Sequence, residues 1–227
     1  MAYSVVCGLV LFGLSVSTTF AQRITFDTMP PDWTVKGKPF TRDAVFEIQK
    51  DPSDPSHHWL SMTADKATAS LLSGGTLNVD LKKTPILRWR WRTTVLPTGA
   101  DGRDPEKDDQ AIGIYISSGP RFKQQSIAYR WETQPPAGTD GFARYAGGAV
   151  SIKWFALRDK SHADGKTFFT EERNLAEDFQ KAFGAIPEKI GIGISCNSQY
   201  TGSRAEAQLD WIEFVAPDQQ VTASTPQ

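Results

Sequence analysis

Apolar and polar residues alternate along most of the chain, in short runs separated by turn-forming residues. The clearest run covers residues 85–92, PILRWRWR, where Leu87, Trp89 and Trp91 alternate with three arginines. Successive side chains of a β-strand point to opposite faces, so this run predicts a strand with one aromatic face and one guanidinium face. A long polar loop follows it, and then a second alternating run that ends near residue 117.

Similar short runs recur throughout the rest of the chain. They predict strands over residues 23–26, 44–49, 59–63, 67–72, 76–81, 125–133, 149–157, 189–196 and 205–215. Turn signals such as Gly74-Gly75 and the segment DPSDPSHH mark the boundaries between them.

One helix is predicted, over residues 174–183. Asn174 is a good N-cap residue, and Glu177 follows three positions later, as in a capping box. Leu175, Phe179 and Phe183 recur every four residues and so share one helix face. Many short strands with one late helix indicate an all-β protein, an antiparallel β-sandwich of the jelly-roll type.

Residues 1–21 have the pattern of a secretory signal peptide. An apolar core over 5–16 precedes small residues at positions 19 and 21, which predicts cleavage after Ala21. The alternative is an uncleaved membrane anchor, but the apolar run is shorter than the ~20 residues of a spanning helix. We therefore expect an exported protein, periplasmic or secreted, with one domain over 22–216, a polar tail over 217–227 and no membrane segment after cleavage.

Charge and cysteine content narrow the class of protein further. The formal net charge is -1, without a block of like charges, which argues against a nucleic-acid-binding protein. Only Cys196 would remain after cleavage, so no intrachain disulfide could form and the packed core must supply the stability. We expect a monomer with an inert, buried thiol.

The arginine face of residues 85–92 is the first candidate binding surface. If the tryptophans point into the core, Arg88, Arg90 and Arg92 point away from it. By the same parity, Arg130 and Glu132 face away from the core on a strand that would lie alongside. Guanidinium groups bind carboxylates and sulfates through paired hydrogen bonds, so this surface predicts an acidic glycan as ligand. The alternative is that the arginines pair with acidic residues across strands and only stabilise the sheet.

The sequence contains few candidate catalytic residues. The sequence has no H-E-x-x-H, G-x-S-x-G or P-loop motif. Glu132 with Asp108 or Asp109 would suit a glycosidase carboxylate pair, whose separation the sequence does not give. Tyr115 and Arg90 would suit a lyase, as base and as partner of a uronate.

Trp59 follows a loop that contains two histidines. Sugars stack on exposed indole rings, so we expect Trp59 to be a binding platform at the surface.

Several motifs occur in a fixed order: LRWRWR, the GAD of the loop, KDDQAIGIYI, YRW, the ERN before the helix, FGAIP, and GIGISCNSQYTGSRAEAQLDWIEF. Together they resemble an exported bacterial family known as domain of unknown function 3047, over roughly residues 24–214. The resemblance implies an exported, single-domain, β-rich protein. The order ITFD, PPDW, strands and a terminal strand with an aspartate is also similar to jelly-roll carbohydrate-binding modules.

Oxygen-rich side chains suggest structural calcium at two places. The loop over 97–109 holds five acidic residues, among them Asp108 and Asp109, and calcium takes about 6–8 oxygen ligands. The spacing matches no EF-hand, and the alternative is a solvated charged loop. A second site would join Asp27 to Asp210, because the first and last strands of such sandwiches often lie side by side.

These expectations describe an exported β-sandwich that binds a polysaccharide or oligosaccharide, with acidic glycans favoured. A glycan-cleaving enzyme, hydrolase or lyase, is the second reading. A structural envelope protein that contacts another protein is the third.

Overall fold

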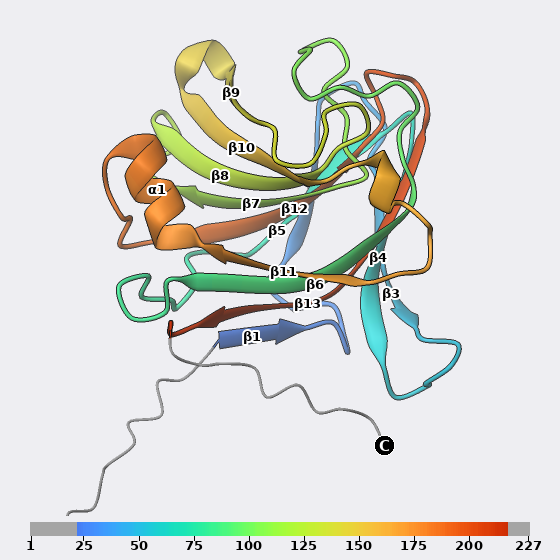
Figure 1. The fold of residues 1–227 in the computed structure, drawn as a ribbon, viewed down its shortest axis with the longest axis horizontal. Helices are drawn as coiled ribbons and strands as arrows, with labels where there is room; N and C mark the ends of the chain where they lie inside the picture. Colours follow the sequence, from blue (N-terminus) through green and yellow to red (C-terminus); the bar gives the residue numbers. More distant parts are fainter. Residues whose placement is uncertain (1–21, 218–227) are drawn as a thin grey trace, which may run out of the picture.

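The computed structural model describes residues 22–217, which form two β-sheets packed face to face (Figure 1). The expected signal peptide over 1–21 and residues 218–227 of the expected tail lie outside the described residues. No helix within 22–217 is both long and apolar enough to cross a membrane. The β-sandwich predicted from the alternating runs is confirmed.

Sheet A has six strands, all paired antiparallel. Their order across the sheet is β11 (Phe169–Asn174), β6 (Ile86–Val95), β13 (Arg204–Val215), β4 (His58–Asp65) and β3 (Val45–Lys50), and β1 (Gln22–Thr25) also pairs with β13. The last strand of the described residues, β13, is therefore central in this sheet.

Sheet B has seven strands. Their order is β2 (Thr34–Gly37), β5 (Thr68–Leu72), β12 (Gly191–Asn197), β7 (Ile112–Ser118), β8 (Gln124–Trp131), β10 (Val150–Arg158) and β9 (Asp140–Tyr145). One pair departs from the antiparallel expectation, because β10 runs parallel to β8. After β8 the chain forms β9 at the edge of the sheet and then reverses direction into β10, which lies between them. Strand β10 is antiparallel to β9 and therefore runs in the direction of β8.

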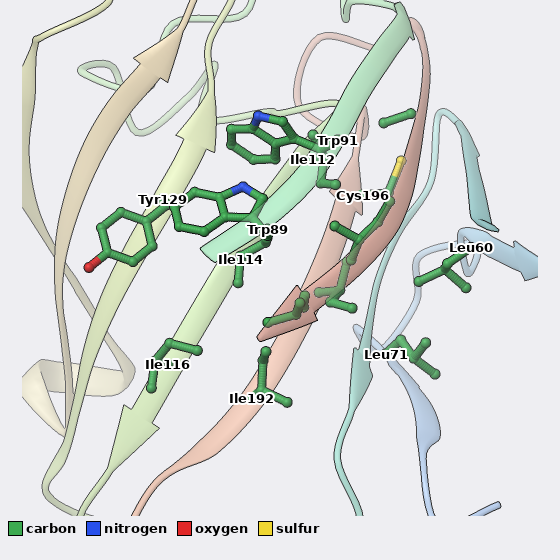
Figure 2. Packing of buried hydrophobic residues seen from close by; sticks show 14 of the residues in the cluster. Leu60, Leu71, Trp89, Trp91, Ile112, Ile114, Ile116, Tyr129, Ile192 and Cys196 are labelled. Atoms are coloured by element: carbon green, nitrogen blue, oxygen red, sulfur yellow. The ribbon is translucent and has the colours of Figure 1, made fainter. Parts of the chain in front are cut away.

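The core lies between the sheets and is rich in aromatic residues. Trp89 and Trp91 on β6 are fully buried, which confirms the predicted parity of that strand. The Trp89 ring stacks on Tyr129 of β8 with centroids 5.0 Å apart (Figure 2). The Trp91 ring lies 5.6 Å from that of Trp131, also on β8. Contacts between rings of different sheets therefore hold the two layers together.

The helix α1 (Leu175–Phe183) begins where its capping residues predict. The backbone N–H of Glu177 donates to the Asn174 Oδ1, 3.1 Å away. The helix ends at Gly184, whose φ of 80° is in the left-handed region that glycine adopts without strain.

Four strand assignments differ from the sequence prediction. Residues 76–81 form no strand, because Asp80 starts a turn: its carbonyl accepts from the N–H groups of Lys83 and Thr84. Strands β2, β9 and β11 were not predicted. The first two lie at edges of sheet B and the third at an edge of sheet A, where one-sided pairing tolerates exposed and polar residues.

Candidate functional site

A groove of about 420 Å³ runs over the outer face of sheet B. Its side chains come from the strand positions that alternate with the core positions, such as Tyr115 and Ser117 of β7 beside the buried Ile114 and Ile116. The lining consists of hydroxyl and amide groups, two tyrosines, glycines and a few aliphatic side chains. Among the described residues that line the groove, none carries a formal charge.

Tyr145, on edge strand β9, presents the most accessible ring of the groove, with 40% of the residue exposed. Its hydroxyl donates to Oδ2 of the buried Asp108, so the ring is held in one orientation. The Tyr115 ring lies over Gly113. A Cβ added at Gly113 would come within 2.7 Å of the Tyr115 Cε2. The glycine is thus needed for that ring to lie along the sheet.

A buried charged cluster adjoins these tyrosines. The Arg130 guanidinium donates from Nη1 to the Asp108 Oδ1 at 2.9 Å, and the same nitrogen lies 3.7 Å from the Glu132 Oε1. The rings of Tyr115 and Trp154 lie over this guanidinium, 5.7 and 5.4 Å from it. All three charged residues are buried, so this cluster is part of the structure beneath the groove end and does not line the groove.

Burial raises the pKa of Glu132 to about 7, and the neighbouring Arg130 opposes that rise. The backbone N–H of Gly102 donates to the Glu132 Oε2 at 3.2 Å, whereas the Oε1 is buried without a hydrogen-bond partner. A Cβ at Gly102 would lie 2.4 Å from the same carboxylate, so only glycine allows the loop to approach this closely.

The loop over 97–109 is anchored, contrary to the alternative of a loop solvated throughout. Asp109 is buried and accepts from the backbone N–H groups of Tyr200 and Thr201, at 3.3 and 2.7 Å. Asp108 is occupied by Arg130 and Tyr145, as described above. These carboxylates could not be assigned from the sequence because their partners are 22 to 92 residues distant.

The arginines of β6 require a correction. Arg88, Arg90 and Arg92 point away from the core as predicted, but β6 belongs to sheet A and β8 to sheet B. The two strands do not pair, so Arg130 and Glu132 lie on the opposite outer face of the sandwich. The expected single surface with all five residues does not exist.

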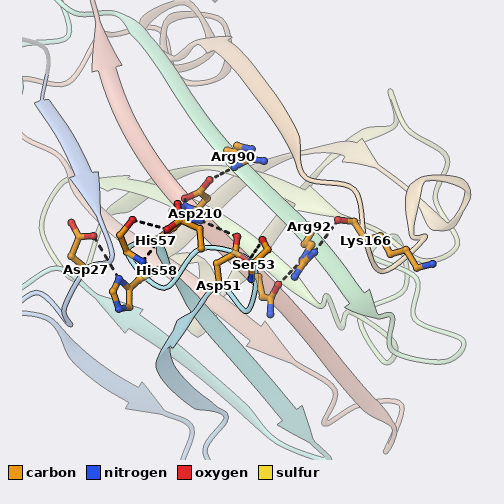
Figure 3. Close-up of polar contacts among 12 residues, drawn as sticks. Asp27, Asp51, Ser53, His57, His58, Arg90, Arg92, Lys166 and Asp210 are labelled. Carbon is orange, nitrogen blue, oxygen red and sulfur yellow. Dashed lines mark hydrogen bonds and ion pairs between the residues drawn. The ribbon is translucent and has the colours of Figure 1, made fainter. Parts of the chain in front are cut away.

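On sheet A the three arginines have protein partners. Arg88 Nε lies 2.6 Å from the Glu172 Oε2 on β11, and Arg92 Nε donates to the Gln208 Oε1 at 2.5 Å. Arg90 pairs with Asp210 (Figure 3). This arrangement matches the alternative reading, in which cross-strand pairs stabilise the sheet.

Asp210 lies at a bulge of β13, because Leu209 pairs with Trp91 while Trp211 pairs with Arg90. Besides Arg90, Asp210 contacts the His57 Nε2 at 2.7 Å, and Asp51 lies 3.3 Å from the other ring nitrogen (Figure 3). The hydrogen bond to Asp210 is the main cause that raises the pKa of His57.

The calcium expectation is not supported by a ligand cluster. Strand β1 pairs with β13 as expected, but Asp27 lies 4.0 Å from His58 and Asp210 is bound to Arg90 and His57. Across residues 22–217, no group of three or more His, Cys, Asp or Glu could hold a metal ion. Calcium at Asp27 and Asp210, or at Asp108 and Asp109, stays an untested prediction.

Trp59 is not the exposed platform that its position beside a loop suggested. It is only 4% exposed, because the Phe168 ring lies 5.5 Å away and the Arg92 guanidinium lies 5.0 Å from its ring. Tyr145 has the exposed ring instead, and it was not predicted because β9 was not recognised as a strand.

The candidate carboxylate pair Asp108 and Glu132 is brought together on one guanidinium nitrogen, but both side chains are buried beneath the groove. No carboxyl group among the described residues lines the groove itself. Tyr115 lies near Arg130 on sheet B, far in the fold from Arg90 on sheet A. Cys196 is buried as expected, and burial raises the pKa of its thiol.

The family described as "Protein of unknown function (DUF3047)" matches residues 32–213. No curated protein matches the sequence. Similar solved structures include the endoglucanase Cel12A from Rhodothermus marinus, with 12% identity, a TM-score of 0.44, and coverage of 87% of this chain and 100% of that one. The xyloglucanase domain of NopAA from Sinorhizobium fredii, in complex with cellobiose, has 8% identity, a TM-score of 0.47, and coverage of 86% and 97%. The groove's own residues must therefore decide what this protein binds.

Proposed function

We propose that this chain, which belongs to the DUF3047 family, binds an uncharged carbohydrate in the groove of sheet B. The observation that supports the proposal is the lining: hydroxyl and amide groups beside two tyrosine rings, without a charged side chain. Ligand sites of this kind combine apolar surface with a few placed polar groups, and tyrosine supplies both. An acidic sugar, predicted from the arginine face, would meet guanidinium groups that already have protein partners.

The test is a glycan screen with neutral and acidic oligosaccharides, followed by calorimetry on the best ligand. Tyr145→Ala removes the exposed ring and should lower the affinity by about tenfold, the effect of one stacked ring. Tyr200→Ala is the matched control, because Tyr200 is 41% exposed and does not line the groove. Equal binding by the two variants would contradict the proposal, and so would a screen in which only acidic glycans bind.

A glycan-cleaving activity is not favoured by any residue of the groove. Hydrolysis by the usual mechanism needs two carboxyl groups on either side of the scissile bond. The two that lie closest, Asp108 and Glu132, are buried and share Arg130. The same oligosaccharides, incubated with the protein and assayed for new reducing ends, should remain intact.

A further inference from the structure

The groove crosses six strands and is narrowest along the strand direction on β7, β8 and β10. Its lining comes from six strands that are consecutive in sheet B, from β5 to β9. Neighbouring strands lie about 4.8 Å apart, so the groove spans roughly 24 Å across the sheet. On β7, β8 and β10 the lining positions are only two residues apart, which corresponds to about 7 Å, whereas on β12 the lining runs from Gly191 to Asn197, about 20 Å.

The middle of the groove has a floor of small side chains. Strand pairing places Gly191, Ser117 and Ser126 in one row across β12, β7 and β8, and Ile152 of β10 continues that row. The Ser117 and Ser126 hydroxyl oxygens are 2.8 Å apart. A Cβ at Gly191 would meet its nearest atom, the Gly75 carbonyl oxygen, at 3.6 Å, so the glycine adds depth and does not relieve a clash.

The Tyr145 end of the groove is not closed by another strand. Strand β9 is the edge of sheet B, and its neighbour on the inner side is β10. A ligand that crosses the floor can therefore extend past Tyr145 without meeting a further strand.

We infer that the groove takes an extended polysaccharide chain, which lies across the strands and is bound along its length. This inference rests on the proposed function and names the ligand class for the same groove. A single sugar ring would fill only part of a 24 Å length. Over β7, β8 and β10 the channel is two residue positions wide, which leaves room for one chain.

Calorimetry with a series of neutral oligosaccharides, from one to six rings, tests the inference. The series is run with an extended β-1,4-linked chain and with a helical α-1,4-linked chain. We expect affinity to rise with each ring of the extended series until the chain reaches the length of the groove, and to stay weak for the helical series. A monosaccharide that binds as tightly as the hexasaccharide would overturn the inference but leave the proposed function standing. Failure of every sugar to bind would overturn both.

A variant at the β12 end makes the test specific. Gly191→Leu fills the floor there and leaves the Tyr145 end open, so hexasaccharide affinity should fall toward that of a trisaccharide while disaccharide affinity is kept. Unchanged hexasaccharide affinity in a folded variant would contradict binding along the whole groove. Ser70→Leu, on neighbouring β5, obstructs the same end and serves if Gly191→Leu folds poorly.

Discussion

At the scale of single residues, two arginines show how burial changes the role of one side chain. Arg90 is partly exposed on sheet A, but its partner Asp210 is 5% exposed, so removal of Arg90 should cost about 1–3 kcal/mol. Arg130 is 1% exposed and lies between two buried carboxylates, where removal of one partner costs about 3–5 kcal/mol. Both arginines alternate with aromatic residues along a strand, so the sequence pattern alone could not distinguish a surface pair from a buried cluster.

Glu132→Gln should reduce the pH dependence of stability. The pKa of Glu132 rises from 4.5 to about 7 because of burial. Between these values the folded protein keeps a proton that the unfolded chain releases, so the free energy of unfolding falls as pH rises through that window. The loss is at most about 3 kcal/mol. Melting temperatures at pH 5 and pH 8 should therefore differ less in the variant than in the unmodified protein.

Glu106→Gln is the control, because Glu106 is exposed in the loop over 97–109, which contacts Glu132 through Gly102. His57 is present in the unmodified protein and in both variants, so its contribution to the pH dependence of stability is the same in all three. If Glu132→Gln showed the pH dependence of the unmodified protein, Glu132 would not be the group that holds the proton.

At the scale of the elements, the sequence predicted what local patterns determine. Runs such as residues 85–92 showed both their strand and its buried face, since alternation depends only on neighbouring residues. Edge strands such as β9 have too few buried apolar residues to show a clear alternation, so they were not predicted. Membership of a sheet was also not predictable, because alternation sets the face of a residue but not the partner strand. The arginine surface was misplaced for that reason.

The N-cap of the helix allows the contribution of one locally predicted contact to be measured. Asn174→Ala should lower the free energy of unfolding by about 1 kcal/mol, because the N–H of Glu177 loses its acceptor. Asn174→Ser keeps an acceptor and should be close to the unmodified protein in denaturant unfolding. Equal loss in both variants would mean that the side-chain cap contributes little.

At the scale of the whole molecule, the two outer faces are chemically distinct. The outer face of sheet A carries paired charges around Asp210, and that of sheet B carries the neutral groove. The core of aromatic residues separates them (Figure 2). A substitution among the paired charges of sheet A should therefore lower stability and leave ligand binding unchanged.

Arg90→Ala is the variant that tests this separation. Asp210 is 5% exposed and would lose one of its cationic partners, so the variant should unfold about 1–3 kcal/mol more easily. Its affinity for the neutral oligosaccharide should equal that of the unmodified protein, measured by calorimetry below the melting transition. Weaker binding in the folded variant would place ligand contacts on sheet A.

The central position of β13 also constrains how the protein can be made. Strands β4, β6 and β1 all pair with β13, which leaves the ribosome after every other described strand (Figure 1). Until residues 204–215 have emerged, β4 and β6 have no partner between them and present unpaired backbone edges, which are sites of aggregation. A nascent chain of this protein must therefore be kept from aggregating until residues 204–215 have emerged.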